Sequence, residues 1–162
     1  MTGRRFLRKT TAIGLMIAAV AALGLMASAV GTASAAPEAH ASRTLNLTEH
    51  ATLRLVKKRG NTLYERGTVR GTLSGPVTAR FNVGIAKVTG TVTIYPRGGG
   101  SLTITVVGYP RSAGVNARFA GRAAVLRGTG RYARAVGTGT FSGVVNRRTW
   151  AASVTANARL RY

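Results

Sequence analysis

Side chains that could do acid–base or metal chemistry are few in this chain of 162 residues. It contains three acidic residues, Glu38, Glu49 and Glu65, two histidines, His40 and His50, and neither aspartate nor cysteine. Without cysteine the chain can form no disulfide, no thiolate nucleophile and no zinc site of the usual Cys/His kind. Two histidines far apart do not make a metal site either. We therefore expect no metal and no other cofactor.

Nucleophile and phosphate motifs are also incomplete. Ser142 lacks the G-x-S-x-G frame of a nucleophile elbow, and its base would have to be one of the two histidines. Gly128-Thr129-Gly130 could cradle a phosphate, but Ala133 replaces the third glycine of G-x-G-x-x-G and no P-loop lysine follows. The alternative is a tight connection between strands that needs positive φ. We assign no catalytic residue, and a non-enzyme is favoured.

Residues 1–35 have the pattern of an export signal. Basic residues from Arg4 to Lys9 precede an uncharged, apolar stretch, and Ala33-Ser34-Ala35 is a small-x-small cleavage pattern. The alternative is a retained membrane anchor. Arg4-Arg5 also suggests twin-arginine export, although ordinary secretion is favoured. We expect a secreted or wall-associated protein whose residues 36–44 form a mobile N-terminal segment.

The chain is strongly basic, with 24 lysines and arginines and a net charge of +21. Removal of residues 1–35 would leave 127 residues with a net charge of +17. Such a charge attracts polyanions. Export favours anionic cell-wall polymers or polysaccharides over nucleic acid as partners. The alternatives are a surface that only confers solubility and a cationic toxin acting on anionic membranes.

Hydrophobicity alternates with a period of two from Leu45 to Tyr162, which predicts strands rather than helices. In the first segment the odd positions from Leu45 to Leu55 are apolar except Glu49. Lys57–Asn61 is expected to end this strand as a turn, and the last strand is expected to run from Trp150 to Tyr162. About eight such segments predict an all-β fold, a small antiparallel closed barrel spanning residues 45–162.

The alternation also assigns side chains to the two faces of the wall. Bulky residues predicted to line a cavity, together with Glu49, are Phe81, Phe119, Phe141 and Trp150. Arginines predicted to face solvent, where they could contact anions, are Arg54, Arg70, Arg80, Arg118, Arg122, Arg159 and Arg161. An inward Glu49 is costly unless it is neutral or paired. A bulge, a pairing with a neighbouring arginine and a contact with ligand remain open as explanations.

The stretch from Val125 to Gly139, VLRGTGRYARAVGTG, followed by Gly139-Thr140-Phe141-Ser142-Gly143, resembles a signature of the allene oxide cyclase barrel-like family, which includes the dirigent proteins. The likeness extends over residues 100–162, with Arg127 in place of a glycine. It implies an eight-stranded barrel with an apolar cavity, often in dimers or trimers. Dirigent proteins use cavity aspartates, which this chain lacks.

Together these observations predict an exported, non-catalytic basic barrel. It would bind a small apolar ligand in its cavity, anionic envelope polymers on its surface, or both. The alternative is a lyase or isomerase that holds a reactive apolar intermediate in the cavity, with Glu49, Glu65 and tyrosines as its polar groups. A cavity with two convergent polar groups would favour the enzyme.

Overall fold

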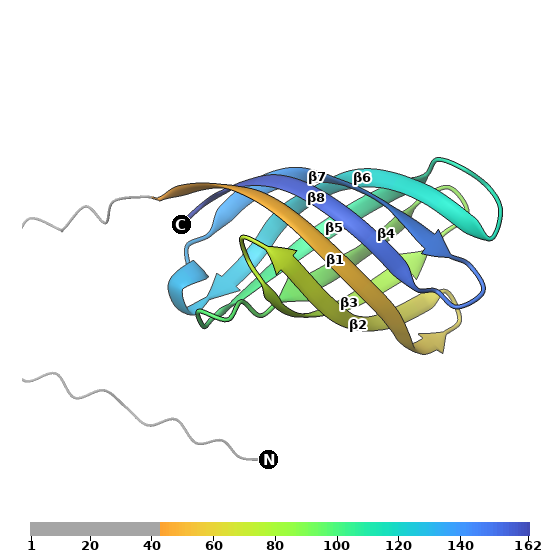
Figure 1. Ribbon diagram of the computed structural model, residues 1–162, viewed down its shortest axis with the longest axis horizontal. Helices are drawn as coiled ribbons and strands as arrows, with labels where there is room; N and C mark the ends of the chain where they lie inside the picture. The colour runs from red at the N-terminus through yellow and green to blue at the C-terminus, as the bar shows by residue number, and fades with distance from the viewer. Residues whose placement is uncertain (1–42) are drawn as a thin grey trace, which may run out of the picture. The chain divides into compact units, whose positions relative to one another are not determined.

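A computed structural model describes residues 43–162, which form a closed antiparallel barrel (Figure 1). Each strand pairs with the next along the chain, and the last returns to the first. The elements are β1 (Thr44–Arg59), β2 (Thr62–Gly71), β3 (Gly75–Val83), β4 (Val88–Ile94), β5 (Ser101–Pro110), β6 (Asn116–Thr129), the 3-10 helix η1 (Gly130–Tyr132), β7 (Val136–Asn146) and β8 (Ala152–Arg161). The predicted all-β closed barrel is confirmed. The predicted signal peptide and residues 36–42 lie outside the described residues.

Alternation of side chains determines which face of each strand is buried. In β2, for example, Leu63, Glu65 and Val69 are buried, whereas Arg66 and Arg70 are exposed. Within residues 43–162 no helix has the length and apolar character needed to cross a bilayer. All seven arginines predicted on the outer face are exposed, namely Arg54, Arg70, Arg80, Arg118, Arg122, Arg159 and Arg161.

Two predicted strand boundaries are wrong. The expected turn at Lys57–Asn61 is mostly strand, because β1 continues to Arg59 with a register shift after Leu55, and only Gly60 and Asn61 form the turn. Exposed lysine and arginine side chains do not interrupt a strand when they point to solvent. The last strand begins at Ala152, two residues after Trp150, whose φ of 59° places it in the preceding turn.

The two ends of the barrel differ. At the end that carries the β2–β3, β4–β5 and β6–β7 connections, Leu73, Leu102, Tyr132 and Leu160 are almost completely buried. The Tyr132 ring from η1 packs on Tyr162, with 5.2 Å between ring centroids. We call this the closed end. The opposite end, with the β1–β2, β3–β4, β5–β6 and β7–β8 connections, is the open end; it lies on the right in Figure 1.

Candidate functional site

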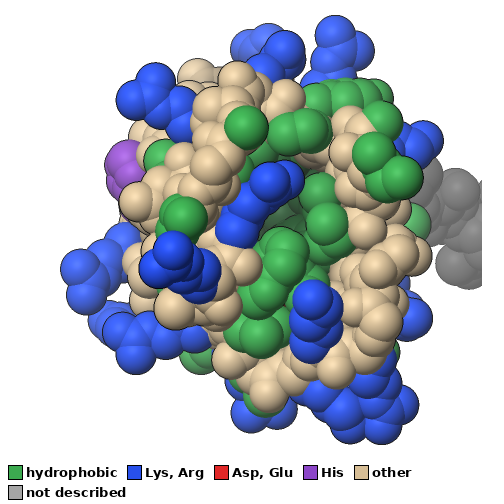
Figure 2. Space-filling view, turned by 90° about the vertical axis from the view of Figure 1, so that its right-hand side faces the viewer, with side chains coloured by type: hydrophobic (Ala, Val, Ile, Leu, Met, Phe, Trp, Pro, Cys, Tyr) green, Lys and Arg blue, Asp and Glu red, His purple; other side chains and the backbone are tan. Residues whose placement is uncertain are grey.

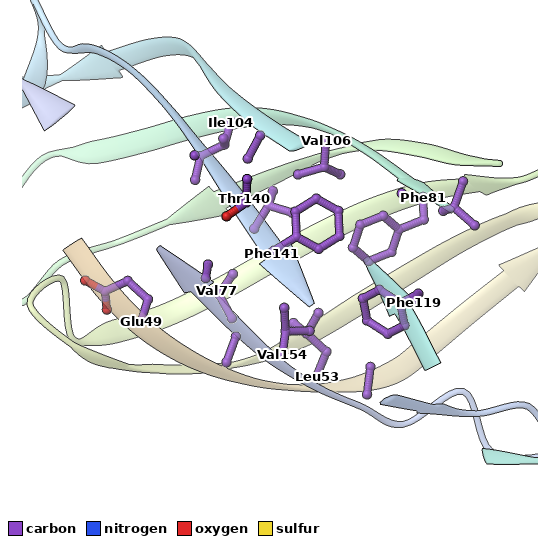
Figure 3. Close-up of a pocket in the computed structure, with 18 of the residues that line it drawn as sticks. Glu49, Leu53, Val77, Phe81, Ile104, Val106, Phe119, Thr140, Phe141 and Val154 are labelled. Carbon is purple, nitrogen blue, oxygen red and sulfur yellow. The ribbon is translucent and has the colours of Figure 1, made fainter. Parts of the chain in front are cut away.

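A cavity of about 260 Å³ lies inside the barrel (Figure 3). Residues from all eight strands line it, and most of their side chains are aliphatic or aromatic. The five residues predicted to line a cavity are all among them, namely Glu49, Phe81, Phe119, Phe141 and Trp150. The aromatic rings therefore narrow the interior without filling it.

Three phenylalanines lie near one another in the cavity (Figure 3). Phe119 and Phe141 are 6.1 Å apart between ring centroids and tilted by 58°, a usual arrangement for aromatic pairs. Each phenylalanine is opposite a glycine on the neighbouring strand: Phe81 and Gly90, Phe119 and Gly143, and Phe141 and Gly121 are register partners. The glycines leave room for the rings, so the register determines where the cavity is narrow.

Basic and aromatic side chains surround the open end. Figure 2 looks onto this end and shows a hollow lined by hydrophobic side chains, with lysine or arginine side chains at its rim. The cavity lining there includes Arg118, Arg147 and Trp150. The Lys58 ammonium lies 5.1 Å from the Trp150 ring centroid. A molecule that enters the cavity by this end passes cationic side chains first.

Arg147 was not predicted as a rim residue. It lies in the β7–β8 connection, where alternation gives no orientation, and its N–H donates to the Val115 carbonyl at 2.7 Å. Side-chain caps order this connection, because Asn146 Oδ1 accepts hydrogen bonds from the N–H groups of Arg148 and Thr149. The contact between two loops therefore places Arg147, and an Asn followed by basic residues is the only local sign of it.

Glu49 is buried near the closed end, with 6% of its surface exposed. Its Oε1 accepts a hydrogen bond from the Leu73 N–H at 2.8 Å, while its Oε2 has no partner among the described residues. Burial raises the pKa of this carboxyl, although the backbone hydrogen bonds at Leu73 and Thr72 oppose the shift. A Cβ on Gly71 would lie 2.6 Å from Oε2, so a glycine is required beside it.

Neither structural explanation predicted for Glu49 is correct. Its register is regular on both sides, opposite Gly71 on β2 and Ala156 on β8, so there is no bulge at this position. Its partner is a backbone N–H of the β2–β3 connection rather than an arginine. The sequence could not indicate this partner, because it is 24 residues away in a turn.

Glu65 is the second buried carboxyl, with 4% of its surface exposed. It lines the cavity from β2, between Leu55 on β1 and Ala79 on β3. Its Oε2 has no hydrogen-bond partner in the described part of the chain. Desolvation by burial alone raises the pKa of Glu65 to about 7. The carboxyl is therefore a neutral acid below about pH 7 and a potential hydrogen-bond donor.

The two carboxyl groups do not converge. Glu49 is opposite Gly71 and Leu55 is opposite Glu65, so six residues separate them along the β1–β2 ladder. At the rise of a strand this is about 20 Å. His50 is on the outer face, where its Nδ1 is 3.2 Å from Thr155 Oγ1. Among residues 43–162 no group of three His, Cys, Asp or Glu side chains could hold a metal ion. The cavity contains two isolated acids rather than an acid–base pair.

The Gly128–Gly130 segment spans the end of β6 and the first residue of η1. It leads into η1, and Gly130 has a φ of +58°, as expected for a tight turn that needs a glycine. η1 spans three residues, too short to provide a helix terminus for an anion. Its structural role is to bring Tyr132 beneath the barrel at the closed end.

Cations dominate the outer face. Both acids in the described range point inward, so no carboxylate neutralises the exposed arginines there. Arg54 on β1 is directly opposite Arg66 on β2. Arg80 lies 5.7 Å from the ring centroid of Tyr64. An aromatic side chain therefore lies beside an exposed arginine on this face.

Both the inner and the outer surface are therefore candidates for binding, by different physical means. The inner surface offers burial of apolar groups, and the outer surface offers positive charge. Comparisons with protein-family models, with curated proteins and with solved structures found no match.

Proposed function

We propose that the protein is an exported, non-catalytic barrel that binds a small apolar ligand in its cavity. The observation that carries the proposal is the cavity of about 260 Å³, lined by apolar side chains and reached from the open end. Small-molecule sites are concave and mostly apolar, with a few polar groups that orient the ligand. The volume suits a compact molecule.

The free energy of covering apolar cavity side chains favours binding of an apolar ligand. Phe81, Phe119 and Val154 line the cavity and are only partly buried. Covering such surface with a ligand contributes roughly 25 cal/mol per Å² of apolar area removed from water. The alternative function, a lyase or isomerase resembling allene oxide cyclase or dirigent proteins, needs convergent polar groups, and the distance between Glu49 and Glu65 argues against it.

A second binding function is favoured by the outer face. Arg54 and Arg66 are exposed and opposite each other, and within residues 43–162 neither has an acidic partner, so the pair is repulsive. An anionic polymer lying across β1 and β2 would neutralise both guanidinium groups and relieve this repulsion. We therefore propose anionic envelope polymers as surface partners of the exported protein.

Trp150, the single tryptophan, provides a direct test of cavity binding. Titration with camphor, a compact apolar ketone, should shift its fluorescence to saturation at one molecule per barrel. Ala156→Leu fills the cavity from β8 and should weaken binding at least about tenfold. Ser153→Leu places the same side chain on the outer face of β8 and should leave binding unchanged. Absence of saturable binding, or equal effects of both substitutions, would contradict the proposal.

A further inference from the structure

The two carboxyl groups inside the barrel differ in what holds them. Glu49 accepts a hydrogen bond from the Leu73 N–H, and Gly71 leaves space for its carboxyl, where a Cβ would collide. The fold itself therefore uses this carboxyl. Glu65 Oε2 has no such partner among residues 43–162, although only 4% of the surface of Glu65 is exposed. An unsatisfied buried polar atom costs about 1–3 kcal/mol. The described part of the chain therefore leaves hydrogen-bonding capacity of Glu65 unused.

The position of Glu65 in the cavity wall makes its carboxyl available for a hydrogen bond with a ligand. Glu65 lines the cavity, and its register partners Leu55 and Ala79 provide no polar group. A leucine would suit the wall at this position better than an acid would if packing were the only requirement. The structure thus places Glu65, a carboxyl that does not hold a turn as Glu49 does, against an apolar cavity, the arrangement that orients ligands in such sites.

We propose that Glu65 recognises the ligand, its neutral carboxyl donating a hydrogen bond to a carbonyl or ether oxygen of an uncharged apolar molecule. This assignment rests on the proposed function, since it needs a ligand in the cavity. An uncharged molecule fits for two reasons. A cation would have to pass Arg118 and Arg147 at the rim, and an anion would have to lose its hydration to reach an acid.

The side chains next to Glu65 are uncharged, so burial and a bound ligand determine whether its carboxyl is protonated. On β1 the inward neighbours are Leu53 and Leu55, and on β3 they are Ala79 and Phe81, none of which titrates. The other inward acid, Glu49, is about 20 Å along the ladder. Arg118 and Arg147 line the cavity from the open end, Arg159 lines it from β8, and Lys58 lies over Trp150. Ionisation of Glu65 removes the donor, so recognition of an oxygen acceptor should weaken as the pH rises.

Paired probes can isolate this hydrogen bond. Camphor carries a carbonyl oxygen, and bornane is the hydrocarbon with the same skeleton. At about pH 5.5 the protein should bind camphor about tenfold more tightly than bornane, the effect of one net hydrogen bond. Glu65→Leu should bind both equally, while Glu65→Gln, whose amide also donates, should retain the preference. Arg66→Gln, on the outer face of the same strand as Glu65, serves as the control and should also retain it.

Raising the pH distinguishes the Glu65 carboxyl from the amide of the Glu65→Gln variant. Between about pH 5.5 and pH 8.5 the preference for camphor should disappear in the unmodified protein and persist in Glu65→Gln, because only the acid ionises. Thermal unfolding of each variant checks that it folds. A camphor preference that survives in folded Glu65→Leu overturns the assignment, as does tighter binding of bornylamine than of camphor. Equal binding of camphor and bornane by the unmodified protein contradicts the assignment alone, whereas failure to bind either contradicts the proposed function as well.

Discussion

Glu65 links the stability of the protein to pH. The carboxyl titrates at about 4.5 when exposed and at about 7 in the folded barrel, because burial disfavours its charged form. Between these values the folded state holds a proton that the unfolded chain has lost. The free energy of unfolding therefore decreases as the pH rises from about 4.5 to 7, and the full loss persists above pH 7.

Replacing Glu65 with glutamine should remove this loss. The difference between the two pKa values corresponds to on the order of 3 kcal/mol. We expect Glu65→Gln to be more stable than the unmodified protein by about this amount at pH 8, with a much smaller difference near pH 4. Urea denaturation at both pH values measures it. Arg66→Gln, on the outer face of the same strand, is the control. A stability difference that does not change with pH would contradict the pKa assigned to Glu65.

Neighbouring strands in this barrel pack large side chains opposite glycines. Phe141 on β7 is opposite Gly121 on β6, and Phe119 on β6 is opposite Gly143 on β7. Such pairs let an aromatic ring cover the backbone of the neighbouring strand. Each of these two strands thus places a phenylalanine opposite a glycine of the other. This arrangement fixes their register more firmly than a uniform aliphatic face would.

Alanine should lower the stability much more at Gly121 than at Gly108. In Gly121→Ala the new Cβ would collide with the Val107 carbonyl oxygen and lie 2.6 Å from the Phe141 ring. We expect this variant to lose about 1–3 kcal/mol of stability. In Gly108→Ala the nearest atom is the tip of the same ring at 3.3 Å, which can move slightly. Its stability should stay within about 1 kcal/mol of the unmodified protein. Chemical denaturation distinguishes them, and equal losses would refute this account of the packing.

Charge separation characterises the molecule as a whole. Lysine and arginine side chains are exposed, three of them also lining the cavity, while Glu49 and Glu65 are buried, so the exposed surface of residues 43–162 is positive. Self-repulsion lowers the stability of such a protein and its field attracts anions. Both effects are screened by salt, which distinguishes them from the burial of apolar groups in the cavity.

Retention on a sulfated polysaccharide resin tests the surface charge. The protein should bind at about 0.1 M salt and elute before about 1 M, because the screening length decreases from about 10 to 3 Å. Arg54→Ser with Arg66→Ser should elute earlier than Arg122→Ser with Arg134→Ser, which loses equal charge outside the opposed pair. Retention that molar salt does not change would contradict electrostatic binding. Equal elution of the two variants would show a diffuse field rather than a β1–β2 face.

The wall of the barrel could be predicted from the sequence, but its ends could not. Alternation with a period of two identified both the cavity residues and the solvent-facing arginines, since each strand has one face buried. Connections lack this period. The partner of Glu49 in the β2–β3 turn, the position of Arg147 at the rim and the burial of Tyr132 by η1 all depend on contacts between distant segments.

The packing of Tyr132 and Leu160 beneath the cavity has a kinetic consequence. Because the cavity is closed at that end, a ligand would have to leave by the open end through which it entered. Exchange of the proposed ligand would then be sequential, because a bound molecule has to leave past the guanidinium groups of the rim before the next one enters. For the ligand that we propose, such a barrel would serve storage or carriage rather than conduction.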